Sequence, residues 1–264
     1  MNLQLNNKTA FISGSTAGIG FAIAQRLLNE GATVIINGRS QASVDKAVAE
    51  LKTLSNNDKV SGIAADFAKV EEVNNLISQL AEVDILINNT GIFEPKAFAE
   101  IPDEDWLRFF EINVMSGIRL ARHFFPKMLA KNWGRVIFIS SESAIAIPSE
   151  MIHYGMTKTA QLAISQGMAQ LTAGTNVTVN SILPGPTKSR GVEGFISDLS
   201  VAGNTTTDAV EQNFFKETRP ASLLQRFADV QEIADTVAFY VSPLAAATNG
   251  ASIRVDGGIL KTLG

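Results

Sequence analysis

The sequence predicts an α/β fold in which a seven-stranded parallel sheet is flanked by helices on both faces, a doubly wound arrangement. Two observations predict it. Short β-branched runs alternate with longer stretches of helical spacing along the 264 residues, and such alternation is typical of βαβ units. The short runs are also near-continuously apolar, as strands covered on both faces must be. Since no repeat or low-complexity linker divides the chain, we expect a single domain over residues 1–264.

The expected strands and helices alternate along the chain. The strands are expected at residues 8–13, 32–37, 60–65, 83–88, 135–140, 177–183 and 251–255. The helices are expected at residues 19–29, 43–54, 70–80, 104–131, 151–171 and 229–241. In the first helix, Ile19, Ile23 and Leu27 recur at helical spacing, and Gly31 follows as a C-terminal stop. Right-handed crossovers should place such helices against the sheet.

Residues 185–227 break the alternation. This segment has no strand pattern and contains Gly191, Gly194 and Gly203 together with a Thr/Asp run at residues 205–208. Long insertions of this kind usually cover or bind a ligand. We therefore expect a substrate lid at residues 185–227, and the alternative is a surface insertion without a function.

The composition argues against several classes of protein. The chain has no cysteine, which excludes disulfides, a thiol nucleophile and cysteine-ligated metals. His123 and His153 are its only histidines, so no metal site is expected. A net charge of −4 argues against a nucleic-acid partner, which needs clustered Lys and Arg. No signal peptide or membrane-length apolar run is evident, so we expect a cytoplasmic protein without a membrane partner.

A glycine-rich turn follows the first expected strand and opens the first expected helix. It reads Ser13-Gly14-Ser15-Thr16-Ala17-Gly18-Ile19-Gly20. Glycines make such a turn tight and allow main-chain N–H groups to approach a pyrophosphate at the positive end of the helix. In this context the turn predicts dinucleotide binding. The expected contacts are Gly14, Ser15, Thr16, Gly18, Ile19 and Gly20.

The end of the second expected strand indicates which dinucleotide binds. A carboxylate there would hydrogen-bond the adenosine ribose 2′-hydroxyl of NAD, whereas an arginine accommodates the 2′-phosphate of NADP. Gly38 and Arg39 occupy this region, and the first acid beyond them is Asp45. We therefore expect NADP (as NADPH) to be favoured, with NAD as the alternative cofactor.

Tyr154 and Lys158 stand near the start of an expected helix at a spacing that places them on one face. A phenol with its ordinary pKa of about 10 is a poor acid–base catalyst at neutral pH. A neighbouring ammonium group lowers that pKa, and such a pair can exchange a proton with a carbonyl or alcohol oxygen. Taken alone, the pattern fits a half-buried tyrosine beside a solvated lysine better.

The glycine turn and the Tyr154/Lys158 pair belong to a series of motifs. The turn resembles TGxxxGIG with Ser13 in place of Thr, Asn88-Asn89-Thr90-Gly91 resembles NNAG, and the pair matches YxxxK. The other motif positions are Asn113, Ser141, Pro184-Gly185, Thr187 and Val255-Asp256-Gly257-Gly258. In this order and spacing, the set resembles the short-chain dehydrogenase/reductase (SDR) family over essentially the whole chain. The resemblance implies a Rossmann-like fold and an NAD(P)-dependent oxidoreductase that transfers hydride between a nicotinamide and a carbonyl or secondary alcohol.

The resemblance also implies roles for single residues. Tyr154 would be the general acid in reduction and the base in oxidation, and Lys158 would hold the nicotinamide ribose and lower the Tyr154 pKa. Ser141 would hydrogen-bond the substrate oxygen, and Asn113 would hold a water that links Lys158 to solvent. Besides Arg39 at the end of the second expected strand, the further cofactor contacts that the resemblance implies are Asp66, Phe67, Asn89, Gly91, Tyr154, Lys158, Pro184, Gly185 and Thr187.

Two alternatives from the same sequence stay open. The chain could be a 3-oxoacyl-carrier-protein reductase, although the stretches at residues 131–133 and 173–176, where a carrier protein would dock, are poor in Arg. It could also be a non-catalytic protein that keeps the cofactor fold, although Asn113, Ser141, Tyr154 and Lys158 are all present.

The substrate and the assembly are predicted only coarsely. The apolar residues expected around the substrate are Ile145, Ile147, Met151, Phe195, Phe214 and Phe215. They predict a small-molecule substrate of mainly apolar character, and Glu142 and Glu150 would disfavour an anionic one if they face the cleft. The family resemblance implies a homotetramer or homodimer that assembles through the helices at residues 104–131 and 151–171 and the C-terminal strand.

Overall fold

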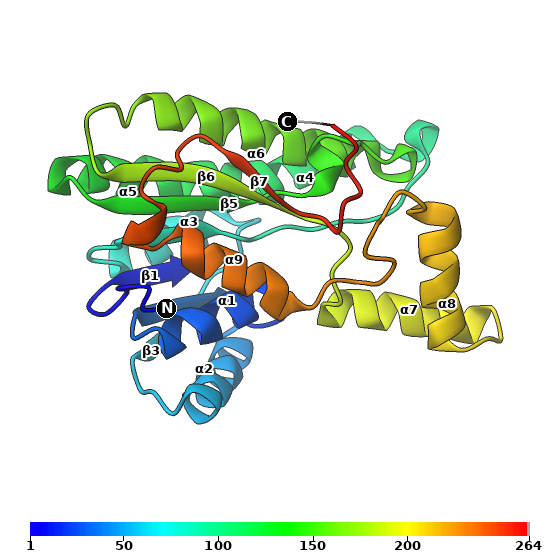
Figure 1. The fold of residues 1–264 in the computed structure, drawn as a ribbon, viewed down its shortest axis with the longest axis horizontal. Coiled ribbons are helices and arrows are strands. Elements are labelled where there is room, and N and C mark those ends of the chain that lie inside the picture. Colours follow the sequence, from blue (N-terminus) through cyan, green and yellow to red (C-terminus); the bar gives the residue numbers. More distant parts are fainter. Residues whose placement is uncertain (263–264) are drawn as a thin grey trace.

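The computed structural model shows a three-layer α/β fold, with one sheet between two layers of helices (Figure 1). The structure describes residues 1–262, without the side chains of Arg190 and Phe195. Within this part of the chain, the sheet has seven strands in the order β3-β2-β1-β4-β5-β6-β7, and every neighbouring pair is parallel. The predicted doubly wound parallel fold is confirmed.

The strands and helices lie close to their expected ranges. The strands are β1 (Thr9–Ile12), β2 (Thr33–Gly38), β3 (Val60–Ala64), β4 (Ile85–Asn88), β5 (Gly134–Ile139), β6 (Val177–Pro184) and β7 (Ser252–Val255). The helices are α1 (Gly18–Asn29), α2 (Gln41–Ser55), α3 (Val70–Gln79), α4 (Asp103–Phe110), α5 (Ser116–Lys131), α6 (Ile152–Gln170), α7 (Arg190–Ala202), α8 (Thr207–Asn213) and α9 (Val230–Tyr240). None of these helices, within the described residues, has the length and apolar character needed to cross a bilayer.

Successive residues of the central strands enter two separate cores. Ile12 of β1 and Ile87 of β4 pack with apolar residues of α1, α2 and α9. Their neighbours Phe11 and Leu86 pack on the other face with residues of α3, α5 and α6. Because side chains alternate between the two faces of a strand, a sheet covered on both sides needs apolar residues at every position. This explains the continuous apolar runs in the sequence.

The single helix expected at residues 104–131 is instead α4 and α5 joined by a π-helical turn at Glu111–Met115. Asn113 lies in this turn, where its side chain donates to the main-chain oxygen of Ile92 at 3.0 Å and accepts from its N–H at 2.7 Å. A π turn accommodates one extra residue and re-aims the side chains around it. Hydrophobic spacing does not reveal such an insertion, because the helix continues on both sides of it.

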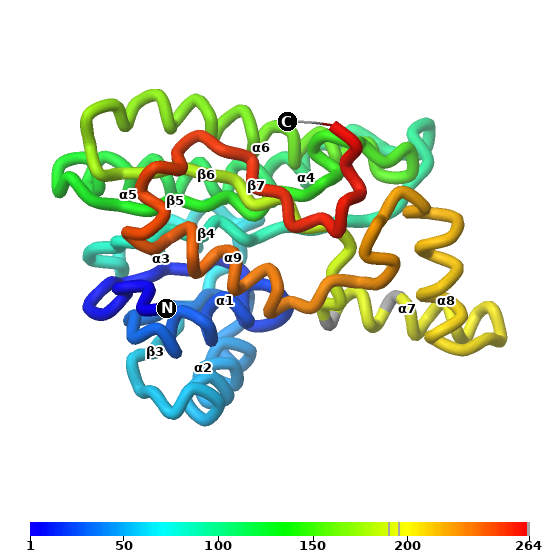
Figure 2. The backbone as a smooth tube through the Cα atoms, in the orientation of Figure 1, coloured from blue at the N-terminus to red at the C-terminus, as the bar shows by residue number. Residues whose placement is uncertain are grey.

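The segment at residues 185–227 contains α7 and α8, which the sequence analysis did not predict. Figure 2 shows the chain leaving the sheet after β6, running out through these helices and returning to α9. A bridge between Thr187 and Ala228 joins the two ends of the excursion. Ile196, Phe215 and Phe227 form a small apolar cluster inside it. The segment is therefore a helical unit with its own packing.

Candidate active site

Hydrogen bonds of buried polar side chains stabilise the glycine turn between β1 and α1. The Ser15 hydroxyl donates to the main-chain oxygen of Ile12 at 2.6 Å and accepts from the N–H of Asn37 at 3.0 Å. The Asn37 side chain accepts from the N–H of Gly14 at 3.1 Å. Ser15 was expected to contact the cofactor, but its side chain is fully buried. The Ser15 hydroxyl therefore shapes the turn, and the cofactor contact of Ser15 stays a prediction.

The loop after β4 is hydrogen-bonded to the same turn. Asn89 Nδ2 donates to the main-chain oxygens of Ser13 at 3.0 Å and Gly14 at 2.8 Å. In return, the Ser13 hydroxyl accepts from the N–H groups of Asn89 and Thr90, both at 3.0 Å. The hydroxyl that Ser13 shares with the threonine of the family motif therefore joins the ends of β1 and β4. No motif in the sequence indicates this role.

Two adjoining cavities lie along the carboxyl ends of the strands. The glycine-turn cavity, of about 710 Å³, lies over the turn after β1. The tyrosine cavity, of about 670 Å³, contains Tyr154. Residues that line both are Ile19, Asn89, Gly91, Ile92 and Ser189. The two form one groove at β1 and β4, where the strand order reverses, and open α/β sheets bind ligands at such a point.

The glycine-turn cavity fits a dinucleotide. Gly14 and Gly18 have φ values of +60° and +59°, a conformation that other residues rarely adopt. No side chain of the described residues caps the first turn of α1, and that turn carries no acid, so its N–H groups remain available to an anion. The expected cofactor residues that line this cavity are Gly14, Thr16, Gly18, Ile19, Gly20, Arg39, Asp66, Phe67, Asn89 and Gly91.

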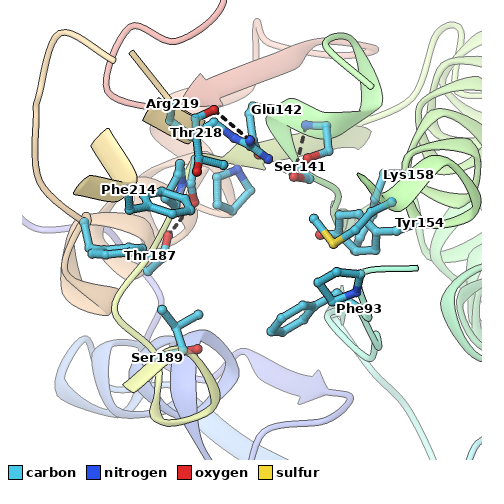
Figure 3. A pocket seen from close by; sticks show the side chains of 18 of the residues that line it. Phe93, Ser141, Glu142, Tyr154, Lys158, Thr187, Ser189, Phe214, Thr218 and Arg219 are labelled. Atoms are coloured by element: carbon cyan, nitrogen blue, oxygen red, sulfur yellow. Dashed lines mark hydrogen bonds and ion pairs between the residues drawn. The ribbon is translucent and has the colours of Figure 1, made fainter. Parts of the chain in front are cut away.

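The tyrosine cavity brings together three of the four catalytic candidates, Ser141, Tyr154 and Lys158 (Figure 3). Ser141 follows β5, and the other two lie on α6. Lys158 Nζ donates to the main-chain oxygen of Ile139 at 2.9 Å and lies 5.6 Å from the centre of the Tyr154 ring. The expected cofactor residues Pro184, Gly185 and Thr187 line the same cavity.

Asn113, the fourth candidate, lines neither cavity. It is fully buried, and its side chain donates to Thr157 Oγ1 at 3.0 Å as well as to Ile92. Its main-chain oxygen accepts from Gln161 Nε2 at 2.6 Å. Asn113 therefore contacts Thr157, which directly precedes Lys158, and links the π-helical turn to α6.

Burial governs the ionisation of the groups in the tyrosine cavity. It raises the pKa of Tyr154 above the usual 10, and the nearby Glu142 carboxylate raises it further, against the effect of the Ser141 hydroxyl. Burial lowers the pKa of Lys158 to about 8, against the attraction of Glu142. The family resemblance implied a lowered Tyr154 pKa. The chain's own groups shift it the other way, because a phenolate is disfavoured when it is buried beside a carboxylate.

Glu142 and Arg219 form a polar group at one side of the tyrosine cavity. The Ser141 hydroxyl donates to Glu142 Oε2 at 2.5 Å. Arg219 Nε lies 3.8 Å from Glu142 Oε1, and Arg219 Nη1 lies 3.2 Å from Glu150 Oε1. Figure 3 shows Arg219 approaching Glu142 from the side opposite Tyr154. Glu142 and Glu150 were considered as cleft residues from the sequence, whereas Arg219, which belongs to no motif, was not.

The apolar lining differs in part from the expectation. Met151 and Phe214 line the tyrosine cavity as expected. The expected residues outside the lining are Ile145, Ile147 and Phe215. Phe215 is buried in the cluster inside the 185–227 segment, whereas its neighbour Phe214 lines the cavity. The side chain of Phe195 lies outside the described part of the structure.

Several known proteins are similar to this chain over nearly all of its length. The family model described as short chain dehydrogenase matches residues 8–199. The uncharacterized oxidoreductase YvaG of Bacillus subtilis is 49% identical over 100% of both chains. The 3-oxoacyl-[acyl-carrier-protein] reductase FabG of Aquifex aeolicus is 31% identical and covers 98% of this chain and 100% of its own. The L-sorbose reductase of Gluconobacter frateurii, solved with NADPH and L-sorbose, superimposes with a TM-score of 0.93 at 31% identity over 100% of both chains.

Together, the groove, the glycine turn and these relatives define the class of the protein as an NAD(P)-dependent oxidoreductase. More narrowly, the chain belongs to the short-chain dehydrogenase family. The predicted family and enzyme class are confirmed, and the protein acts on small-molecule substrates.

Proposed function

We propose that this protein is an NADP-preferring oxidoreductase that interconverts a small ketone and its secondary alcohol. The observation that carries the proposal is the single groove that joins Ser141, Tyr154 and Lys158 to the glycine turn. In the reducing direction, a ketone, NADPH and one proton give the secondary alcohol and NADP⁺. The test is a screen of ketones with NADPH, read as loss of reduced-nicotinamide absorbance.

The groove provides a place for each part of the cofactor. The first-turn N–H groups of α1 would receive the pyrophosphate, and Arg39 the 2′-phosphate. Asp66 and Phe67 would flank the adenine. The residues assigned to the nicotinamide half are Asn89, Gly91, Tyr154, Lys158, Pro184, Gly185 and Thr187. When bound, NADPH supplies the hydride for the carbonyl carbon.

The chain's own residues handle the proton. Tyr154 donates its phenolic proton to the carbonyl oxygen, and its raised pKa keeps it protonated until then. Ser141 donates a hydrogen bond to the same oxygen. The Lys158 ammonium stabilises the phenolate left behind. Lys158 would then pass a proton on to the phenolate. The main-chain oxygen of Asn113 has a second lone pair beside its bond from Gln161, and a water there would replace the proton that Lys158 gave up.

Three further expectations enter as part of the proposal. Residues 185–227 form a substrate lid, because Ser189, Val192, Ile196 and Phe214 line the tyrosine cavity. The protein forms a homotetramer or homodimer through α4, α5, α6 and the C-terminal strand β7, in keeping with Leu107 and Phe110 of α4, which are 69% and 39% exposed. It works in the cytoplasm.

The 3-oxoacyl-carrier-protein reductase is the second candidate, on the likeness to FabG. Against it, Glu142 and Glu150 give the tyrosine cavity acidic groups, which disfavour an acidic carrier protein close by. Activity on a 3-oxoacyl carrier substrate far above that on free ketones would favour this candidate. Because the L-sorbose reductase was solved with L-sorbose, the screen also includes hydroxylated ketones. A non-catalytic role is set aside, since the chain belongs to an enzyme family.

Replacing Arg39 with Ala is expected to weaken NADPH binding about tenfold, the lower range for a hydrogen bond to a charged group, and to leave NADH binding unchanged. Arg39 is exposed and lines the glycine-turn cavity. The measurement is fluorescence titration with both nucleotides. Lys46→Ala, an exposed cation of α2 outside the cavity lining, is the control. Equal weakening of NADH and NADPH would contradict the assignment of Arg39 to the 2′-phosphate.

The pH profile of ketone reduction is expected to follow Lys158. Because the pKa of Lys158 is about 8, its ammonium form is lost as the pH rises through that value. The kcat/KM for reduction should therefore decline above pH 8, approaching tenfold per unit, since this profile reports groups of the free enzyme. Parallel NADPH titrations separate binding from chemistry. A flat profile up to pH 9.5 would show that the Lys158 charge is not required.

A further inference from the structure

We propose that Glu142 and Arg219 form a subsite for a hydroxyl group on the carbon next to the reacting carbonyl, so that α-hydroxy ketones and the matching vicinal diols are the preferred substrates. The inference rests on the proposed function, because it takes Ser141 and Tyr154 as the groups that hold the carbonyl oxygen. It assigns specificity to two residues that no family motif contains.

The subsite is built from buried charged groups. The side chains of Glu142 and Arg219 are only 8% and 15% exposed, and both line the tyrosine cavity with Ser141 and Tyr154. Glu142 directly follows Ser141, and Arg219 comes from the end of the lid segment. A buried carboxylate is costly unless hydrogen bonds and opposite charge compensate it. The groups that compensate the Glu142 carboxylate therefore indicate which substrate groups the subsite can bind.

The Glu142 carboxylate has hydrogen-bonding capacity left over. A carboxylate accepts at about four lone-pair sites, and Ser141 donates to one oxygen of Glu142. Arg219 Nε is 3.8 Å from the other oxygen, which is too far for a hydrogen bond. Burial raises the pKa of Glu142, while Ser141, Arg219 and Ser143 oppose the shift. A neutral donor from the substrate would complete this set without adding charge.

Competition for the Ser141 proton makes the subsite selective. A serine hydroxyl has one proton, and in this structure Glu142 accepts it. A plain ketone can receive that hydrogen bond only if Glu142 loses it, which costs a buried carboxylate one of its hydrogen bonds. An α-hydroxy ketone brings its own hydroxyl to Glu142 and releases Ser141 to the carbonyl oxygen. The N–H groups of Arg219 can then donate to the oxygen of that hydroxyl.

The geometry favours a hydroxyl on the adjacent carbon. An oxygen held by Ser141 at about 2.8 Å lies within about 5 Å of the Glu142 carboxylate. A hydroxyl one carbon away can donate across this gap. A carboxylate in the same place would meet Arg219 but also Glu142 and Glu150, so the acids outnumber the cation. The subsite therefore favours an uncharged hydroxyl over an anion.

Three ketones with one carbon skeleton test the proposal: 1-hydroxybutan-2-one, butan-2-one and 2-oxobutanoate. The full-length protein is assayed with NADPH and each ketone. We expect kcat/KM for the hydroxy ketone to exceed that for butan-2-one about 100-fold or more, since sites built to bind a hydroxyl strongly reject analogues that lack it. The 2-oxobutanoate should be a poorer substrate than the hydroxy ketone.

Glu142→Gln and Arg219→Leu test the two residues. Each is expected to lower the preference for the hydroxy ketone at least about tenfold, mainly through a higher KM for it. With Glu142→Gln, kcat/KM for butan-2-one should also rise, because a neutral amide competes less for the Ser141 proton. Glu30→Gln is the matched control, since Glu30 pairs with Arg26 at 2.9 Å and lines neither cavity. NADPH titration of each variant shows that the fold is retained.

The outcomes distinguish failure of the subsite alone from failure of the proposed function. Equal turnover of the hydroxy and plain ketones, or a preference unchanged in both variants, overturns the subsite and leaves the oxidoreductase function standing. A preference for 2-oxobutanoate overturns it in favour of a carboxylate site at Arg219. No turnover of any of the three ketones by protein that binds NADPH overturns the subsite and the proposed function together.

Discussion

Replacing Tyr154 with Phe is expected to lower kcat for ketone reduction about 10³-fold, within the usual range for loss of a general acid. In the proposed mechanism the phenol is the proton donor of the tyrosine cavity, and phenylalanine keeps the ring but has no proton to give. The raised pKa of Tyr154 means that the group is protonated at neutral pH, as the donor must be. The measurement is steady-state turnover with NADPH and the best ketone from the screen.

The chain supplies its own control for this substitution. Tyr240 is the only other tyrosine, and it lies in α9 outside both cavities. Tyr240→Phe removes the same hydroxyl and should keep wild-type turnover. NADPH affinity should fall far less than turnover in Tyr154→Phe, which would assign most of the loss to the chemical step. Wild-type turnover by Tyr154→Phe would refute the assigned mechanism.

The fold was predictable because the strands and most of the helices leave clear patterns of apolar residues in the sequence. Strands such as β4 are buried at every position, so they read as uninterrupted apolar runs. The helices were predicted less completely than the strands. The π-helical turn at Glu111–Met115 preserves the helical pattern around it, and α7 exposes Leu199 and Val201, which weakens its apolar face. Local spacing carries no information on either feature.

The candidate site was predictable where its residues are neighbours in sequence or belong to motifs. The glycine turn is contiguous, and Tyr154 and Lys158 stand one helical turn apart. Contacts between distant segments were not predictable. Arg219 reaches Glu142 across 77 residues of chain, and Asn89 reaches Gly14 across 75. Such contacts depend on how the segment at residues 185–227 and the strand ends meet, which only the folded chain shows.

Replacing Gly20 with Ala is expected to weaken NADPH binding about 100-fold and to lower the melting temperature. A Cβ at this position would lie 2.5 Å from Asn89 Nδ2, 2.8 Å from the main-chain oxygen of Gly14 and 2.9 Å from the Cα of Ser15. Two of these atoms are main chain and cannot rotate away. Overpacking of this kind costs about 1–3 kcal/mol, and the strain falls on the turn assigned to the pyrophosphate.

The control for Gly20 is the same change at Gly167. Gly167 is exposed in α6, and its added Cβ would meet no described atom within 4 Å. Gly167→Ala should therefore stabilise the helix by about 0.5–1 kcal/mol and leave NADPH binding unchanged. NADPH titration and thermal unfolding of both variants give the comparison. Wild-type NADPH affinity in Gly20→Ala would show that the turn yields to the methyl group.

A third variant identifies the route by which Gly20→Ala acts. Asn89→Ala removes the hydrogen bonds from Asn89 Nδ2 to Ser13 and Gly14 without adding bulk to the turn. If the methyl group at position 20 acts by displacing Asn89, the two substitutions share one cause. The double variant should then lose little more NADPH affinity than either single variant. Additive losses would instead assign the effect to direct strain in the main chain of Gly14 and Ser15.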